Sequence, residues 1–288
     1  LAAGAYDTPP LLERSGIGDP HVLRALGITP RIVHRGVGEN LQDHFQAWVQ
    51  MGVRDHATLS DEGKFPKVLL NVLRYVTTKT GPFTFPASNV GAFVPRAGSD
   101  RPMFQIHFSP GAGHQDDKGN MVASERPGVN ASVTFLRPTS VGSVHACGRD
   151  PRAFPKIIHN YLATEHDRTL AIEAFRLLRT IYRSARFAEV ATRELMPGDH
   201  IETDHDVLGY WKRDGKSVYH PVGTTKMGHA DDDLAVVDDA LRVHRVDGLR
   251  VVDASIFPMV PSGNTHAPVV AVAERAADLI LGRPMLGG

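Results

Sequence analysis

The sequence predicts an α/β protein (α+β overall), made of one discontinuous domain and one inserted domain. Residues 1–45 and 216–288 contain short apolar runs, helix-like segments and Gly- or Pro-containing turns. Between them, residues 46–215 show strand-like alternation of apolar and polar side chains together with two helical patterns. Because the outer segments share one texture, we expect them to form a single α/β domain. We expect the insertion to be an antiparallel sheet flanked by helices.

Composition narrows the possible function classes. Apolar residues make up 42% of the 288-residue chain, and 32 basic residues balance 32 acidic ones, so no charge excess indicates nucleic-acid binding. No apolar run approaches the roughly 20 residues that span a bilayer. Cys147 is the only cysteine, which excludes an internal disulfide and a zinc site built on several thiolates. A single thiol fits a reducing compartment, and we expect a cytoplasmic protein.

The first segment begins abruptly. It lacks an initial Met, and Leu1–Ala3 has the character of the end of a buried strand, so we expect the chain to be the C-terminal part of a longer protein. A short helix is expected after Pro10 and should end near Gly16, because glycine suits the position that closes a helix. Asp19 and Pro20 start a second short helix, and residues 30–33 form a strand.

The elements of the insertion follow from periodicity. Helical spacing predicts one helix over residues 67–76 and a longer one over residues 164–191. Thr164 and Asp167 resemble a capping box at the start of the longer helix. Alternation predicts strands at residues 46–53, 104–108, 129–136, 142–145 and 155–158.

The stretch over residues 248–281 is the one most typical of a binding site. The apolar run Leu249–Val252 predicts a buried strand that ends at Asp253, and a loop rich in Pro, Ser, Gly and Asn follows. A helix then begins near Pro268, with apolar residues nearly all round, so we expect it to be buried.

The start of this helix points to a ligand. Asn264 or Thr265 is a suitable cap. The free N–H groups and partial positive charge of a helix start face whatever lies before it, and His266 lies there. Strand, acidic residue, helix start and imidazole together predict a cofactor site.

Two histidines are candidates for catalysis. His220 precedes Pro221, which favours extended backbone, and an imidazole that titrates near neutrality can act as a general base. A core or surface histidine is the alternative, since the chain has 15. For His266, a positive helix end favours a neutral ring, and an exposed histidine near the cap is the alternative.

Several site types are excluded by motif. The chain contains no G-x-G-x-x-G, no G-x-S-x-G and no H-E-x-x-H. The other histidines of the insertion lack ligand-like spacing, so we expect no metal site.

Five ordered motifs resemble one family, the glucose–methanol–choline (GMC) flavoprotein oxidoreductases, in their choline-dehydrogenase-like branch. The motifs are LAAGAYDTPPLLERSGIG, GVGENLQDH, LRPTSVGSVH with PKIIHNYLATEHDR, YHPVGTTKMG, and LRVVDASIFP with GNTHAPVVAVAERAADLI. The resemblance implies a Rossmann-like FAD-binding domain over residues 1–45 and 216–288, with a substrate-binding domain over 46–215. It also implies that the chain is the C-terminal half, and that a second polypeptide carries the N-terminal ADP-binding half.

The resemblance implies an FAD-dependent alcohol oxidase or dehydrogenase acting on a small primary or secondary alcohol. His220 matches the base that takes the hydroxyl proton as hydride passes to flavin N5, and His266 matches the second active-site position. The residues that match positions beside FAD are Tyr219, Asp253, Ala254, His266, Ala267 and Pro268.

The sequence departs from the family pattern in a few places. His266 stands where choline-dehydrogenase-like members commonly have Asn, which points away from choline. Val141, Thr225, Lys226 and Arg245 also differ from the usual residues. Two alternatives stay open, a hydroxynitrile lyase on the same FAD scaffold and a non-catalytic fragment without a complete cofactor site. The sequence does not decide the substrate, or between oxidase and dehydrogenase.

Overall fold

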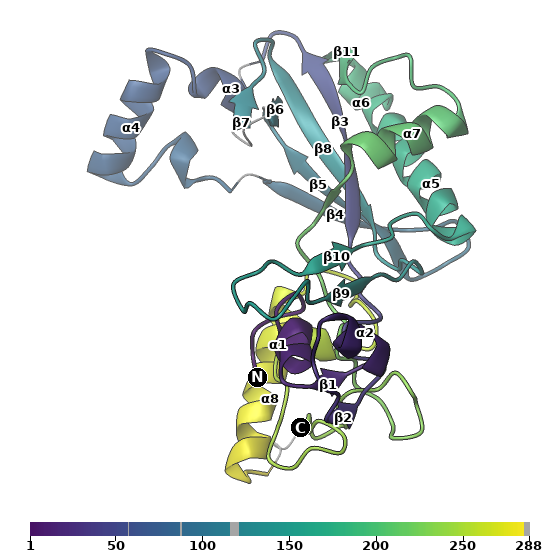
Figure 1. Ribbon diagram of the computed structural model, residues 1–288. Coiled ribbons are helices and arrows are strands. Elements are labelled where there is room, and N and C mark those ends of the chain that lie inside the picture. Colours follow the sequence, from purple (N-terminus) through teal and green to yellow (C-terminus); the bar gives the residue numbers. More distant parts are fainter. Residues whose placement is uncertain (57, 87, 116–120, 285–288) are drawn as a thin grey trace. The chain divides into compact units, whose positions relative to one another are not determined.

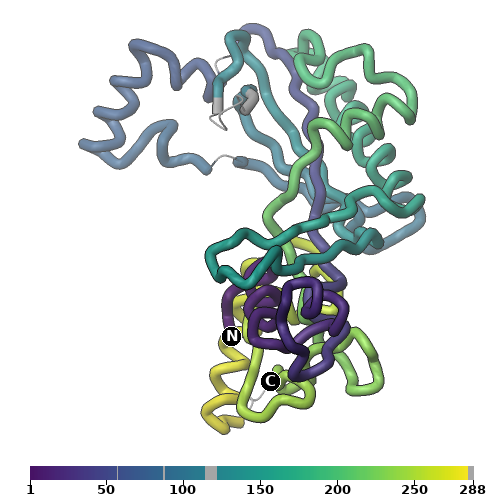
Figure 2. The backbone as a smooth tube through the Cα atoms, in the orientation of Figure 1, coloured from purple at the N-terminus to yellow at the C-terminus, as the bar shows by residue number. Residues whose placement is uncertain are grey.

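The computed structural model describes residues 1–56, 58–86, 88–115 and 121–284, and it divides into two compact units (Figures 1 and 2). Unit 1 comprises Leu1–His44, Leu136–Asp167 and Ser217–Gly288, and unit 2 comprises Phe45–Phe135 and Arg168–Lys216. The mixture of helices with an antiparallel sheet confirms the predicted fold class. The sequence assigned residues 136–167 to the insertion, whereas the structure places them in unit 1.

Unit 1 is built from short elements joined by long loops. Its helical elements are α1 (Thr8–Arg14), α2 (Pro20–Ala25), η2 (Ala254–Ile256) and α8 (His266–Leu281). Its strands are β1 (Ile17–Gly18), parallel to β2 (Ile32–Val33), and β9 (Ser143–His145), antiparallel to β10 (Lys156–Ile158). α1 and α2 both begin with proline in the first turn, where a missing N–H costs nothing.

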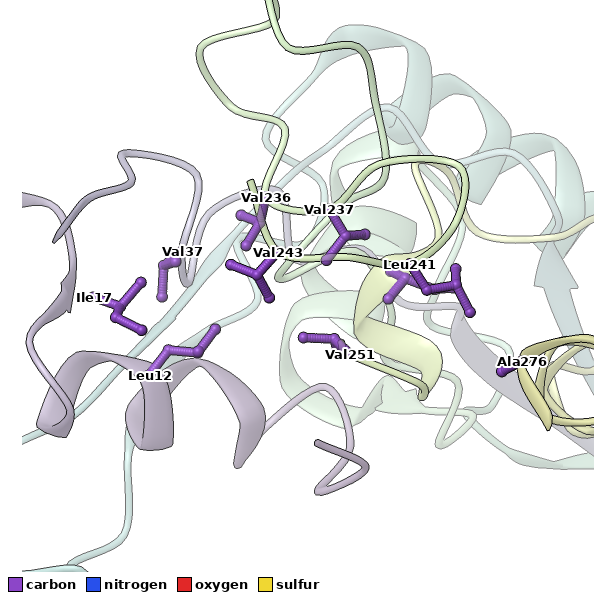
Figure 3. Packing of buried hydrophobic residues seen from close by; sticks show 10 residues of the cluster. Leu12, Ile17, Val37, Val236, Val237, Leu241, Val243, Val251 and Ala276 are labelled. Carbon is purple, nitrogen blue, oxygen red and sulfur yellow. The ribbon is translucent and has the colours of Figure 1, made fainter. Parts of the chain in front are cut away.

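The core of unit 1 joins its two sequence ends (Figure 3). Leu12 and Ile17 come from the first segment, and they lie in one cluster with residues more than 200 positions later. Burying one such side chain stabilises the fold by about 1.5–3 kcal/mol. The later members are Val236, Val237, Leu241, Val243, Val251, Ile256 and Ala276.

An ionic cluster also holds unit 1 together. His145 on β9 lies 2.6 Å from the carboxylate of Glu13 and 3.1 Å from that of Glu39. Burial acts to lower the pKa of His145, but the two carboxylates outweigh it and raise that pKa to about 9. This cluster ties β9, which lies within residues 136–167, to the first segment of unit 1.

Two predictions for the C-terminal stretch are wrong. Leu249–Val252 is not a strand, because its pairing with residues 241–243 stops at one isolated antiparallel bridge, between Arg250 and Arg242, and its other backbone bonds within the described residues go to Leu1 alone. A strand needs a continuous ladder of such bonds. Helix α8 is not buried within this chain, since Ala276 is its only fully buried residue and all of its residues are described.

Unit 2 is built on an antiparallel sheet in the order β11-β3-β8-β5-β4. Strands β3, β5 and β8 lie within one or two residues of their expected bounds, whereas β11 was not predicted and β4 had no predicted bounds. A separate small pair, β6 (Gly113–Gln115) with β7 (Met121–Ala123), was not predicted. The sheet strands are β3 (Phe45–Val53), β4 (Val90–Pro95), β5 (Pro102–Ser109), β8 (Gly128–Phe135) and β11 (Ala191–Met196).

Helices α5 and α7 pack on this sheet (Figure 1). Tyr182 Oη donates to the carbonyl of Val49 (3.0 Å), and Tyr210 Oη donates to that of Trp48 (2.9 Å). Trp211 is fully buried against Phe45 and Phe135. The helical elements of unit 2 are α3 (Leu59–Glu62), α4 (Lys67–Thr78), η1 (Pro82–Thr84), α5 (Glu165–Tyr182), α6 (Ala185–Ala188) and α7 (Asp204–Asp214).

The predicted helix over residues 164–191 is two helices. The chain turns at Ser184, whose backbone is extended, before α6. Half of the predicted capping box is present, because the N–H of Asp167 donates to Oγ1 of Thr164 (3.2 Å), while the Asp167 carboxylate accepts instead from the N–H groups of Thr139 (2.8 Å) and Ser140 (2.8 Å). A short strand, β12 (Lys216–Ser217), lies where the chain passes from unit 2 back to unit 1.

Candidate active site

His220 lies in an extended segment of unit 1 that pairs with the residues just before β3. The N–H of Val218 donates to the carbonyl of His44 (2.9 Å). Val222 exchanges two backbone hydrogen bonds with Gln42, at 2.9 and 3.0 Å. This pairing brings the segment 42–44 alongside His220, although about 175 residues separate them in the sequence.

Asp43 organises this segment. Its carboxylate accepts hydrogen bonds from the backbone N–H of His220 (2.9 Å), the hydroxyl of Ser217 (2.5 Å) and the hydroxyl of Tyr161 (2.6 Å). Asp43 is 4% exposed, so its charge is stabilised by these donors rather than by water. Burial and the charge of Asp43 raise the pKa of Tyr161, which keeps its hydroxyl protonated and able to donate.

Tyr219 stands out from this buried segment. Its φ is +62°, a left-handed conformation that costs a non-glycine residue about 1–2 kcal/mol. Its N–H donates to the hydroxyl of Ser217 (2.8 Å), and its side chain is 85% exposed. Strain of this kind persists only where the surroundings enforce it, and it is frequent at functional sites. The turn therefore presents an aromatic ring at the surface immediately before the buried His220.

His44 and His220 face each other in the interior. Their Nδ1 atoms lie 2.9 Å apart, and their rings are nearly perpendicular. The Nε2 atom of His44 lies 3.2 Å from the carbonyl oxygen of Leu136. His44 is fully buried, and burial lowers its pKa to about 4. His44 is therefore a neutral ring at neutral pH.

The loop before α8 reaches His220 through Asn264. The amide nitrogen Nδ2 of Asn264 lies 3.4 Å from Nε2 of His220. The predicted second residue, His266, is exposed at the first position of α8, and within the described residues its ring makes no hydrogen bond. Thr265 occupies the cap position without a side-chain bond to the helix. The first turn of α8, including Ala267 and Pro268, is thus open to solvent and uncapped.

Asp253 and Ala254 lie behind this region. The carboxylate of Asp253 accepts from Gly4 N–H (3.0 Å), the Thr8 hydroxyl (2.6 Å) and Ser255 N–H (2.8 Å). The carbonyl of Ala254 accepts from the N–H of Gly223 (3.2 Å). These bonds tie the residues after His220 to the N-terminal loop of unit 1.

Three residues of this site were not among the predicted catalytic residues. Asp43 and His44 appeared only within the motif GVGENLQDH, and Asn264 appeared only as a candidate helix cap. The sequence signal for Asp43 and His44 is an acidic residue beside a histidine, a few residues after a Gly-containing turn. In the described part of the chain, no cluster of three or more His, Cys, Asp or Glu side chains is arranged to hold a metal ion.

Comparisons with known proteins identify relatives over the whole chain. An oxygen-dependent choline dehydrogenase of Staphylococcus aureus is 37% identical over 99% of this chain. Pyridoxine 4-oxidase from Mesorbium loti has a similar structure, with a TM-score of 0.81, 30% identity, and coverage of 99% of this chain and 51% of that one. Formate oxidase of Aspergillus oryzae gives a TM-score of 0.90 at 26% identity, over 98% of this chain and 53% of that one.

The chain spans 50% of the length of the choline dehydrogenases it matches. In the described residues, no helix combines the length and the apolar character that crossing a membrane requires. Two family models, both described as GMC oxidoreductase, match residues 1–46 and 138–273, together more than half of the chain. The chain belongs to the GMC oxidoreductase family.

Proposed function

We propose that this chain forms the flavin-facing and substrate-facing part of an FAD-dependent oxidoreductase that oxidises a small primary or secondary alcohol, with His220 as general base. The observation that carries the proposal is the buried His220, held by Asp43 and His44 and approached by Asn264 from the open start of α8. Membership of the GMC family supports the cofactor and the reaction class.

The residues fit the flavin end of FAD. The uncapped first turn of α8 offers N–H groups and a partial positive charge, which suit an electron-rich ring edge. His266 and Ala267 are exposed there, and Tyr219 presents an exposed ring that suits stacking or edge contact. Asp253 has a structural role here, because its carboxylate accepts hydrogen bonds from Gly4, Thr8 and Ser255 of this chain. The ADP end has no matching phosphate loop in this sequence.

His220 is suited to accept the hydroxyl proton of the substrate. Its backbone is anchored by Asp43 and its ring by His44, so little reorganisation is needed when it becomes charged. The buried carboxylate of Asp43, which accepts from the backbone N–H of His220 (2.9 Å), supplies a nearby negative charge that favours the imidazolium. Bound FAD would supply the acceptor for the hydride that leaves the carbinol carbon. We propose that Asn264, whose Nδ2 lies 3.4 Å from Nε2 of His220, holds the substrate oxygen beside His220, and that His266 makes a second contact to substrate or flavin.

A second polypeptide carrying the ADP-binding half would complete the enzyme. Two features support this partner. The chain covers half of its relatives, and α8 exposes apolar side chains that a further domain would bury. The exposed large apolar residues of α8 are Val270, Ile280 and Leu281.

The test is reconstitution. The chain would be mixed or fused with the N-terminal half of a GMC relative and FAD, and reduction by a panel of small alcohols followed as bleaching of the flavin absorbance. His220→Ala is expected to retain flavin and to slow reduction by about 10²–10⁴-fold, the usual contribution of a general base. The matched control is His34→Ala, which removes another buried histidine of unit 1, 5% exposed, whose ring contacts the carbonyl of His244.

Three results would refute the proposal. Reduction at the normal rate in His220→Ala would remove this residue as the base. Flavin that stays oxidised with every alcohol, while a cyanohydrin releases cyanide, would support the lyase alternative. Failure to bind FAD in the presence of the N-terminal half would support a non-catalytic fragment.

A further inference from the structure

We propose that His44 is a positioning residue, which fixes the ring nitrogen of His220 that carries the proton and leaves Nε2 of His220 free of hydrogen to accept one from substrate. The inference rests on the proposed role of His220 as general base. It concerns a hydrogen-bonded chain that runs from the Leu136 carbonyl through His44 to His220.

The donor and acceptor in each of these hydrogen bonds follow from the carbonyl of Leu136. A carbonyl oxygen only accepts hydrogen bonds, so the Nε2 atom of His44, 3.2 Å away, must carry a hydrogen. His44 is fully buried, and rotating its ring by half a turn would replace both nitrogens with carbons at these contacts. Both hydrogen bonds would then be lost inside the protein, where an unpaired polar group costs about 1–3 kcal/mol. The observed ring orientation of His44 is therefore the stable one.

The next step concerns the other nitrogen of His44. Burial lowers the pKa of His44 to about 4, an effect that the nearby His220 reinforces and the Leu136 bond and Asp43 partly oppose. At neutral pH the ring is thus uncharged, and with its hydrogen on Nε2 its Nδ1 is a bare acceptor. A 2.9 Å contact between two nitrogens needs one hydrogen, so Nδ1 of His220 must donate.

The consequence falls on Nε2 of His220. A neutral imidazole carries one hydrogen, and the contact with His44 holds it on Nδ1. The lone pair of Nε2 then points to the side from which Asn264 approaches, at 3.4 Å from its amide nitrogen. When His220 takes a proton, its Nδ1–H bond to His44 is unchanged, so no second proton has to move. Without this lock, a population of His220 would hold its hydrogen on Nε2 and be unable to act as base.

The experiment reads the tautomers directly, without flavin. The 288-residue chain labelled with ¹⁵N-histidine would be recorded near pH 7 by long-range ¹H–¹⁵N correlation, which separates bare from protonated ring nitrogens. His220 signals are identified by their loss in His220→Gln. We expect one tautomer for each ring, with hydrogen on Nδ1 of His220 and on Nε2 of His44. Hydrogen on Nε2 of His220 in the unmodified chain would overturn the proposal.

Two variants then interrupt the hydrogen bonds between Leu136, His44 and His220 in different ways. His44→Phe removes both hydrogen bonds of His44. His44→Gln can still donate to the Leu136 carbonyl but has no acceptor at the Nδ1 position, so it tests the proposal even if His44→Phe fails to fold. In both, His220 should lose its single tautomer. The control is His34→Gln, because His34 is also buried and bonds the carbonyl of His244 at 2.5 Å. An unchanged Nδ1–H signal of His220 in both His44 variants would refute the relay.

Activity in the reconstituted enzyme separates the two proposals. Loss of the lock should lower the rate of flavin reduction about 10- to 100-fold, with flavin binding unaltered, because a misplaced catalytic group costs rate rather than affinity. Normal alcohol oxidation in His220→Ala would refute the base role while leaving the measured tautomers intact. A His220 tautomer that is the same with and without His44 would refute the positioning role of His44 while leaving the base role of His220 intact.

Discussion

Replacing Asp43 by Asn tests whether one buried carboxylate holds the candidate active site together. The carboxylate accepts three hydrogen bonds, from His220 N–H, Ser217 Oγ and Tyr161 Oη, at 2.5–2.9 Å. Asn keeps the shape but presents an NH₂ group where only acceptors fit, so at least one donor faces another donor. Asp43 is 4% exposed, and water therefore cannot fill in for the lost acceptor.

The magnitude follows from the number of bonds. A hydrogen bond to a charged group contributes about 1.5–3 kcal/mol. The two hydroxyls are able to rotate toward other acceptors, but the backbone N–H of His220 is not. Counting that N–H and one hydroxyl predicts a loss of about 3–6 kcal/mol in the free energy of unfolding. With a denaturant slope of about 2 kcal/mol/M, the urea midpoint should fall by about 1.5–3 M.

The assay is urea unfolding followed by circular dichroism and tryptophan fluorescence. The control is Asp150→Asn, because that carboxylate is 52% exposed and its bonds are to the neighbouring Arg152, so its loss should stay within about 0.5 kcal/mol. A loss below about 1 kcal/mol for Asp43→Asn would show that the carboxylate is not the organising group. The reasoning about the segment around His220 would then fail with it.

Two further predictions concern unit 1. The pKa of His145 is raised to about 9 from an unfolded value near 6.5. Its ionic cluster therefore stabilises the folded state fully below about pH 6.5, and up to about 3 kcal/mol of this stability is lost as pH rises through 9. The urea midpoints at pH 6 and pH 9.5 should differ less in His145→Gln than in the unmodified chain. Gly223 has φ +91°, and an added Cβ would lie 2.5 Å from the Asn40 carbonyl oxygen, so Gly223→Ala should cost more than about 2 kcal/mol. Gly248→Ala, at φ +73° in open space, should cost only about 1 kcal/mol, and equal thermal shifts would contradict the role of close approach.

Local pattern was sufficient for the elements that obey one clear period. The helix at Lys67–Thr78 and the strands β3 and β8 lie close to their predicted bounds. In a half-buried strand and in an amphipathic helix, apolar side chains recur with a fixed period, and this period is visible in the sequence. The choice of His220 as the candidate base came from the resemblance of the motif YHPVGTTKMG to the GMC family and not from local pattern.

The same apolar patterns gave wrong predictions for two segments whose burial depends on contact with segments distant in the sequence. Leu249–Val252 is as apolar as a strand but meets no continuous ladder, and α8 is as apolar as a core helix but lies exposed within this chain. Apolar composition states that a surface needs covering, and it does not state which segment covers it.

By itself, the sequence predicted the fold class from local periodicity, and the resemblance of its ordered motifs to the GMC family identified the family and the candidate base. Only the tertiary structure decided what surrounds that base. Asp43, His44 and Asn264 meet His220 from segments up to 177 residues away, through hydrogen bonds whose geometry no local pattern records. The direction of a hydrogen-bonded chain depends on which atoms face one another, and that is a property of the folded backbone.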